Sequence, residues 1–121
     1  MALLSLGMRV VRLMQPYLIG EGEGIMYFSR VIMGKVGPDK IDEAFAIFTD
    51  DIIPAAKEQQ GYRGANLFTN PQTGQFIATT VWKTEEDMIS SDKSGYLKEQ
   101  LDKVAALLTE PPVIEHYIVH Y

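Results

Sequence analysis

Two histidines, His116 and His120, are the side chains of this sequence that most readily exchange protons near neutral pH. They stand four residues apart in the stretch VIEHYIVHY, and a strand with this spacing directs both to one face of a sheet. His116 is therefore our candidate general base. A hydrogen-bonded packing role for this histidine is the alternative interpretation.

A second group of side chains is suited to holding a small ligand by stacking or hydrogen bonding. The Asn66 amide can donate and accept hydrogen bonds, and Trp82 offers an aromatic face and an N–H donor. Tyr96 flanks a Ser- and Gly-rich break between two helical stretches, which is a candidate entrance. For each of them core packing is the alternative. We expect a cavity between sheet and helices to be lined by Ser29, Asn66, Phe68, Trp82 and Tyr96, with Tyr27 as a further candidate.

Arg30 stands in an otherwise apolar stretch and needs a charged partner if it is buried. We expect that partner to be a carboxylate such as Glu115 on a neighbouring strand. The two histidines have no third ligand at a suitable spacing and the chain has no cysteine, so we expect no metal and no cofactor. P-loop and dinucleotide-binding glycine motifs are also absent from the sequence.

The composition indicates one acidic domain. The chain has 121 residues, and 11 Lys+Arg against 16 Asp+Glu give a net charge of −5. This excess argues against nucleic acid as a partner, because phosphates need a clustered positive surface. The apolar run near Met1 is interrupted by Arg9 and Arg12 and is too short to cross a bilayer. We therefore expect no membrane partner and a cytoplasmic location.

Hydrophobic periodicity and turn residues predict the order strand, helix, strand, strand, helix, strand. Pro54 predicts a kink or helix end near Asp50–Asp51, and Thr84 opens a T-E-E-D run close to a capping box. Strands are expected at Ile25–Met33, Tyr62–Thr69, Gln75–Lys83 and Val113–Tyr121, with helices from Pro38 to Gly61, Thr84 to Ser90 and Tyr96 to Thr109. This order is the ferredoxin-like βαββαβ pattern of an α+β fold, a four-stranded antiparallel sheet with its helices on one face.

Both faces of that sheet are predicted to be apolar, although helices cover only one of them. In the third strand the two alternating sets are Phe76, Ala78, Thr80, Trp82 and Ile77, Thr79, Val81. A bare apolar sheet in water needs a cover. We therefore expect a homodimer in which the uncovered faces pack together.

Residues 1–24 differ from the rest of the chain. They are apolar with two arginines, and Glu21-Gly22-Glu23-Gly24 has the composition of a flexible joint. We expect an N-terminal arm over residues 1–24, packed on its own domain or on a partner subunit, and one ferredoxin-like domain over residues 25–121.

Three segments and the closing strand carry a family resemblance. The segments read IIPAAKEQQGYRGANLF, TTVWKTEEDM and SDKSGYLK, and the closing strand follows two prolines. From about Met26 to Tyr121 the chain resembles the antibiotic biosynthesis monooxygenases, a family of dimeric α/β barrels. The resemblance implies a dimer of ferredoxin-like subunits.

The resemblance also limits the chemistry to be expected. The family includes cofactor-independent monooxygenases of phenols and quinols, haem-degrading monooxygenases, isomerases and members without known activity. The asparagine, tryptophan and histidine of the haem-degrading members align with Ser29, Ser91 and Leu101, so haem degradation is not expected. A cofactor-independent monooxygenase acting on a small aromatic, quinol- or phenol-type substrate is implied, with His116 as base. The alternative is a non-catalytic dimer that binds a small apolar ligand or a partner.

Overall fold

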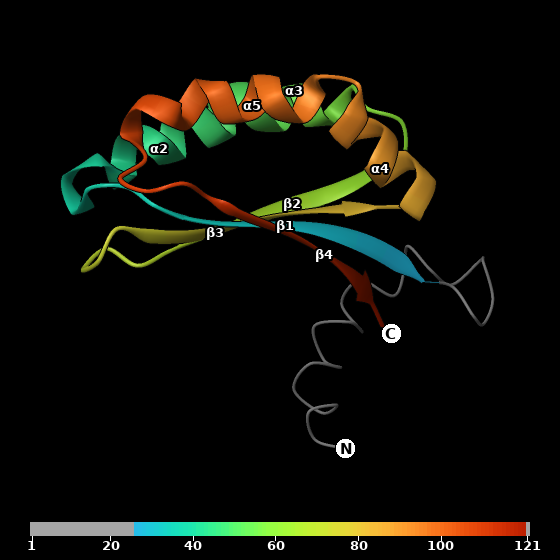
Figure 1. Cartoon of the computed structure of the whole chain (residues 1–121), viewed down its shortest axis with the longest axis horizontal. Coiled ribbons are helices and arrows are strands. Elements are labelled where there is room, and N and C mark those ends of the chain that lie inside the picture. Colours follow the sequence, from blue (N-terminus) through green and yellow to red (C-terminus); the bar gives the residue numbers. More distant parts are fainter. Residues whose placement is uncertain (1–25, 121) are drawn as a thin grey trace, which may run out of the picture.

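The computed structural model describes residues 26–120, which form a four-stranded antiparallel sheet with the helices of this part on one face (Figure 1). The sheet order is β2-β3-β1-β4. In chain order the elements are β1 (Tyr27–Lys35), η3 (Pro38–Lys40), α2 (Ile41–Ile47), η4 (Phe48–Ile52), α3 (Ile53–Lys57), β2 (Tyr62–Thr69), β3 (Gln75–Trp82), α4 (Glu85–Lys93), α5 (Tyr96–Val104), η5 (Ala105–Leu107) and β4 (Val113–Val119). This is the ferredoxin-like α+β fold that the sequence predicts. The arm expected over residues 1–24 lies outside the described residues.

The helix boundaries follow local chemistry. Thr84 caps α4, because its hydroxyl accepts a hydrogen bond from the Asp87 backbone N–H at 3.0 Å. The helix runs to Lys93, three residues beyond the expected end, so that the break before α5 narrows to Ser94 and Gly95. None of the described helices is long and apolar enough to cross a membrane.

Pro54 produces an irregular helix rather than a helix end. The turn that precedes it, η4, is a π-helix, and the N–H that follows this turn, on Ile53, donates to the carbonyl of Phe48. Proline lacks the N–H that a regular α-helix would use at this place, and a wider turn accommodates the missing bond. The expected irregularity near Asp50–Asp51 is confirmed.

The strand register decides which side chains meet the helices. Ile32 of β1 pairs with Ala78 of β3 and with Ile114 of β4, and Leu67 of β2 pairs with Ala78. These positions share one face because directly paired residues point to the same side of a sheet. On this face a buried cluster joins the sheet to the helices and consists of Ala56, Trp82, Met88 and Tyr96.

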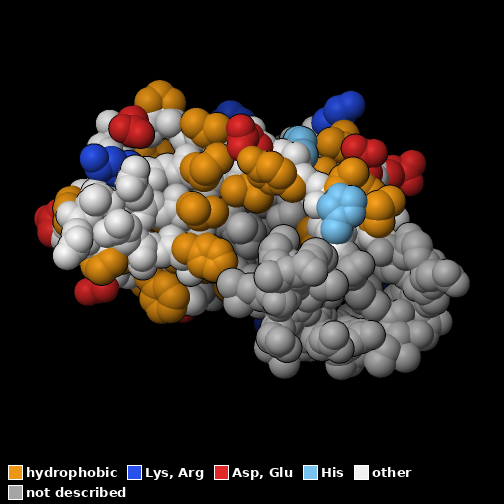
Figure 2. Space-filling model, turned by 90° about the horizontal axis from the view of Figure 1, so that it is seen from below, with side chains coloured by type: hydrophobic (Ala, Val, Ile, Leu, Met, Phe, Trp, Pro, Cys, Tyr) orange, Lys and Arg blue, Asp and Glu red, His pale blue; other side chains and the backbone are white. Residues whose placement is uncertain are grey.

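None of the helices described within residues 26–120 covers the opposite face of the sheet (Figure 1). Four of its large apolar side chains are well exposed: Phe68 at 53%, Ile77 at 39%, Val113 at 51% and Tyr117 at 49%. The view from below shows hydrophobic side chains gathered on this surface (Figure 2). The expectation that both faces are apolar is met.

Candidate functional site

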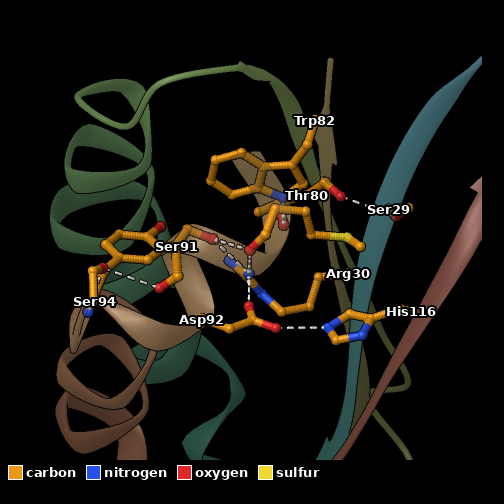
Figure 3. Close-up of polar contacts among 10 residues, drawn as sticks. Ser29, Arg30, Thr80, Trp82, Ser91, Asp92, Ser94 and His116 are labelled. Atoms are coloured by element: carbon orange, nitrogen blue, oxygen red, sulfur yellow. Dashed lines mark hydrogen bonds and ion pairs between the residues drawn. The ribbon is translucent and has the colours of Figure 1, made fainter. Parts of the chain in front are cut away.

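A buried arginine occupies the centre of the helix-covered face. Arg30 lies on β1 and is only 2% exposed. Its Nη1 donates to Ser91 Oγ at 2.9 Å and to Asp92 Oδ1, and it lies 3.5 Å from the carbonyl oxygen of Met88 (Figure 3). All three acceptors belong to α4, so that this one side chain links the middle of the sheet to the end of a helix.

The carboxylate of Asp92 is shared between two basic side chains. While Oδ1 contacts Arg30, Oδ2 lies 2.8 Å from His116 Nε2 (Figure 3). Arg30 and His116 are direct partners across β1 and β4, which brings both to the same side of the sheet. The His116 side chain is 38% exposed and Arg30 is enclosed, so the cluster runs from solvent into the interior.

Two aromatic rings enclose the guanidinium group of Arg30. Its Cζ lies 5.2 Å from the ring centroid of Trp82 and 5.9 Å from that of Tyr96, both within reach of cation–π attraction. Burial raises the pKa of the Tyr96 hydroxyl, while the nearby charge of Arg30 lowers it to a smaller extent. Tyr96 therefore stays neutral at neutral pH and keeps its O–H as a donor.

An apolar cavity of about 70 Å³ lies between the sheet and the helices. A cavity of about 150 Å³ holds a benzene molecule, so this cavity is about half that size and an aromatic ring would enter it only if the lining side chains moved. It is lined by Arg30, Ile32, Val36, Ala44, Phe48, Ile52, Leu67, Phe76, Ala78, Thr80, Tyr96, Leu97, Gln100, Leu101, Val104, Leu108 and Pro112.

Two buried donors on the cavity wall find no acceptor among the described residues. They are Arg30 Nε and Gln100 Nε2. Gln100 is 5% exposed, and its other amide atom, Oε1, accepts from Lys103 Nζ at 3.0 Å. The wall is thus a hydrocarbon surface with two hydrogen-bond donors set into it.

The expected pairing of Arg30 with Glu115 is wrong. In the register, Arg30 lies opposite His116, and Glu115 lies opposite Val31. Glu115 therefore points to the open face of the sheet, where its carboxylate accepts from the hydroxyl of Tyr117. The sequence predicted the need for a carboxylate, and Asp92 provides it.

The structure divides the predicted site residues between the two faces. Tyr96 lines the cavity. Trp82, which was also expected to line the cavity, does not. It is fully buried on the same side of the sheet, with its Nε1 donating to Thr80 Oγ1 at 2.8 Å and its ring in edge contact with Tyr62. His116 is also on this side and reaches the cavity wall through Asp92 and Arg30.

Ser29, Asn66 and Phe68 do not line the cavity. They alternate with Arg30 and Leu67, which do, and they point to the open face. The same holds for Tyr27, and Ser29 Oγ donates to the Thr80 carbonyl at 3.0 Å. Their expected placement between sheet and helices is therefore wrong. Since both faces are apolar, the sequence pattern did not distinguish the helix-covered set from the open set.

Sequence reasoning missed Asp92 and Gln100. Asp92 follows Ser91 in the S-D-K run that was read as a loop, and the extension of α4 over this run brings both residues to Arg30. Gln100 is four residues after Tyr96, so it lies on the apolar stripe of α5. A polar residue on such a stripe was the available signal.

Within residues 26–120 no group of three or more His, Asp and Glu is placed to hold a metal ion. The polar cluster described here has one histidine and one carboxylate, with the arginine as a fixed cation. Such a set can stabilise an anion and exchange a proton with solvent.

No family model matches the chain. Among curated proteins it is similar to the uncharacterized protein Rv2558 of Mycobacterium tuberculosis, with 33% identity over 71 residues, which cover 59% of this chain and 30% of that protein. It is also similar to the uncharacterized protein Rv2557 of the same organism, with 28% identity over 99 residues, 78% of this chain and 42% of that protein. The chain thus spans less than half the length of these relatives.

Solved structures resemble it over most of their length. A candidate antibiotic biosynthesis monooxygenase from Nitrosomonas europaea matches with a TM-score of 0.58 and 23% identity, covering 79% of this chain and 91% of that one. A monooxygenase from the gene ActVA-Orf6 of Streptomyces coelicolor, in complex with the ligand nanaomycin D, matches with a TM-score of 0.65 and 14% identity, covering 80% and 89%. The chain therefore has the fold of the antibiotic biosynthesis monooxygenases.

Proposed function

We propose that this protein is a cofactor-independent monooxygenase that acts on one small phenol- or quinol-type ring held in the cavity between sheet and helices. The observation that carries the proposal is an apolar cavity between the sheet and the helices with the buried cation of Arg30 on its wall. The reaction class is taken by analogy from the Streptomyces coelicolor monooxygenase, which has the same fold; the chemistry of the site has to carry it.

Oxygenation without a cofactor requires an electron-rich substrate anion. In the overall reaction a phenol and one O₂ give a quinone and one H₂O: one oxygen atom becomes the new carbonyl, and the other leaves as water with the two hydrogens that the substrate loses. The substrate supplies all the electrons. Arg30 stabilises the phenolate, because a fixed cation in an apolar site lowers the energy of a neighbouring anion.

The phenol proton is proposed to leave the cavity through water, because Arg30 is always protonated and cannot accept it. His116, which contacts Asp92 and is partly exposed, is the proposed base that takes up a proton as the phenolate forms. Its role is therefore to keep the cluster charge-balanced while the substrate anion is present.

The test is oxygen consumption with a panel of hydroquinones, naphthols and substituted phenols. We expect one O₂ consumed per quinone formed, and His116→Gln should lower the rate at least about tenfold because general bases contribute about 10²–10⁴-fold. His120→Gln is the matched control. If no compound in the panel causes oxygen consumption, the proposed reaction class is wrong. If His116→Gln leaves the rate unchanged, only the role of His116 as the base is wrong.

A non-catalytic ligand-binding protein is the second candidate function. It is favoured by one observation: His116 does not itself line the cavity. A binding protein would show ligand-dependent thermal stabilisation with no oxygen uptake and no change in the ligand.

We further propose that the open face of the sheet packs against a second copy of the chain. Support comes from the exposed apolar side chains gathered there, of which Phe68 and Val113 are each more than half exposed. Such side chains are usually covered at an interface between subunits.

A further inference from the structure

We propose that Arg30 Nε and Gln100 Nε2 form a subsite for an acceptor oxygen inside the cavity, so that the preferred ligand is a single aromatic ring with a phenolic or carbonyl oxygen. The inference rests on the proposed function for the identity of the site. It makes a claim about binding alone, which requires no turnover.

Burial is the first argument. Arg30 is 2% exposed and Gln100 is 5% exposed, and both line the same cavity. Neither Arg30 Nε nor Gln100 Nε2 finds an acceptor among residues 26–120. Buried donors without a partner are destabilising, and folded proteins rarely keep two of them beside one cavity unless something accepts their hydrogen bonds.

The orientation of the Gln100 amide is fixed by Lys103. A lysine ammonium group only donates, so the amide atom at 3.0 Å from Lys103 Nζ must be the oxygen. The amide nitrogen is therefore the atom left for the cavity, and it can only donate.

The Arg30 guanidinium group is held in place on its other edge. Its Nη1 contacts Ser91, Asp92 and the Met88 carbonyl, and these contacts fix the plane of the group. Nε lies outside that set of contacts and carries part of the positive charge. An oxygen with negative charge is therefore favoured over a neutral one.

The apolar side chains of the cavity wall determine which groups the remainder of the ligand can carry. Side chains such as Ile32, Leu67, Phe76 and Val104 surround the two donors with hydrocarbon. A ligand amine would find no acceptor at Arg30 Nε or Gln100 Nε2, and a second charged group would be desolvated without compensation. One apolar ring with one accepting oxygen satisfies both parts of the wall.

The test compares 4-fluorophenol with fluorobenzene, which differ only by the hydroxyl group, by fluorine NMR titration of the full chain without oxygen. We expect the phenol to bind at least about tenfold more tightly, as one satisfied hydrogen bond in an apolar site permits. Gln100→Leu should reduce this ratio to about threefold or less without weakening fluorobenzene. Gln100→Met, which keeps the length of the side chain and removes the N–H donor, should reduce it as well.

The control is Asn66→Leu, which removes an amide from the open face and should leave the ratio unchanged. Equal affinity of the two probes, binding of neither, or an unchanged ratio in Gln100→Leu and Gln100→Met would overturn the subsite. These outcomes are separable from the proposed function. If the chain prefers 4-fluorophenol as expected but no phenol causes oxygen uptake, the subsite is supported and the proposed oxygenase function is wrong. If phenols cause oxygen uptake but the Gln100 variants keep the full preference for 4-fluorophenol, the function is supported and the subsite is wrong.

Discussion

Arg30 on β1 and Asp92 on α4 form an ion pair in which the arginine is almost fully enclosed. A buried cation needs both charge compensation and hydrogen bonds, and Asp92 and Ser91 provide them from one turn of helix. The pair anchors α4 to the sheet and fixes the edge of Arg30 that does not face the cavity. Loss of the carboxylate should therefore affect stability before it affects ligand binding.

Asp92→Asn should lower the free energy of unfolding by about 3 kcal/mol, because it leaves the buried Arg30 without its counter-charge. Asp102→Asn is the matched control: Asp102 pairs with Lys98 on the surface of α5, where both side chains are well exposed. That change should cost less than about 0.5 kcal/mol. Urea unfolding measures both variants, and equal losses would show that the Arg30–Asp92 pair adds nothing to stability.

Gly74 makes a close backbone contact with Val36, one of the residues that line the cavity. Its φ is +83°, its carbonyl accepts from the Val36 N–H at 2.9 Å, and a Cβ at this position would lie 1.9 Å from the Val36 carbonyl oxygen. Gly74→Ala should therefore destabilise the protein by at least about 3 kcal/mol. Gly95 is the control, because its φ is +92° with no atom within 4 Å of a Cβ, and Gly95→Ala should cost only about 1–2 kcal/mol. Similar thermal shifts for the two variants would contradict the clash.

Tyr96 should make stability decline at alkaline pH. Burial raises the pKa of its hydroxyl above the ordinary 10.0, so the folded state keeps a proton that the unfolded state loses. The free energy of unfolding therefore falls as the pH rises above about 10, until the folded-state pKa is passed. In Tyr96→Phe this part of the decline should disappear. A series of urea titrations up to about pH 11 measures it, and an identical slope in the variant would refute the assignment.

Phe68→Glu should convert the proposed dimer into monomers, because it places a charge on the apolar open face. Phe45 is the matched control, since it is exposed to the same 53% but lies on the helix α2. Sedimentation velocity at micromolar concentration measures the result. The proposed interface is wrong if the unaltered chain sediments as a monomer, or if Phe45→Glu disrupts the dimer as strongly as Phe68→Glu does.

The βαββαβ order was predictable because each element has a local signal. Tyr62–Thr69 coincides with β2, bounded by Gly61 and the Asn70–Gly74 turn, and Thr84 caps its helix as expected. The apolar spacing in the first helical region was less informative. Phe48 and Ile52, four residues apart, line the cavity, whereas Phe45, three residues before Phe48, is exposed.

The candidate site was predictable only in part, because the face on which each strand residue lies and the partner of Arg30 both depend on residues far apart in the sequence. The face on which Ser29 or Asn66 lies depends on the strand register and on which face the helices cover, and an apolar pattern on both faces does not specify it. The partner of Arg30 lies 62 residues away in the sequence. Arg30 itself carried a local signal, since a lone charge in an apolar strand demands compensation.

The edge strand β4 carries the residue that links the cavity wall to solvent. Within residues 26–120 it pairs with β1 alone, and its His116 is the outermost member of the cluster that ends at Arg30 on the cavity wall. A molecule bound along the unpaired side of β4 would alter the hydration of His116. Because His116 contacts Asp92 and Asp92 contacts Arg30, it would also alter the electrostatic potential at a ligand in the cavity. Thermodynamic reciprocity then requires that a ligand in the cavity change the affinity of β4 for the bound molecule by the same factor.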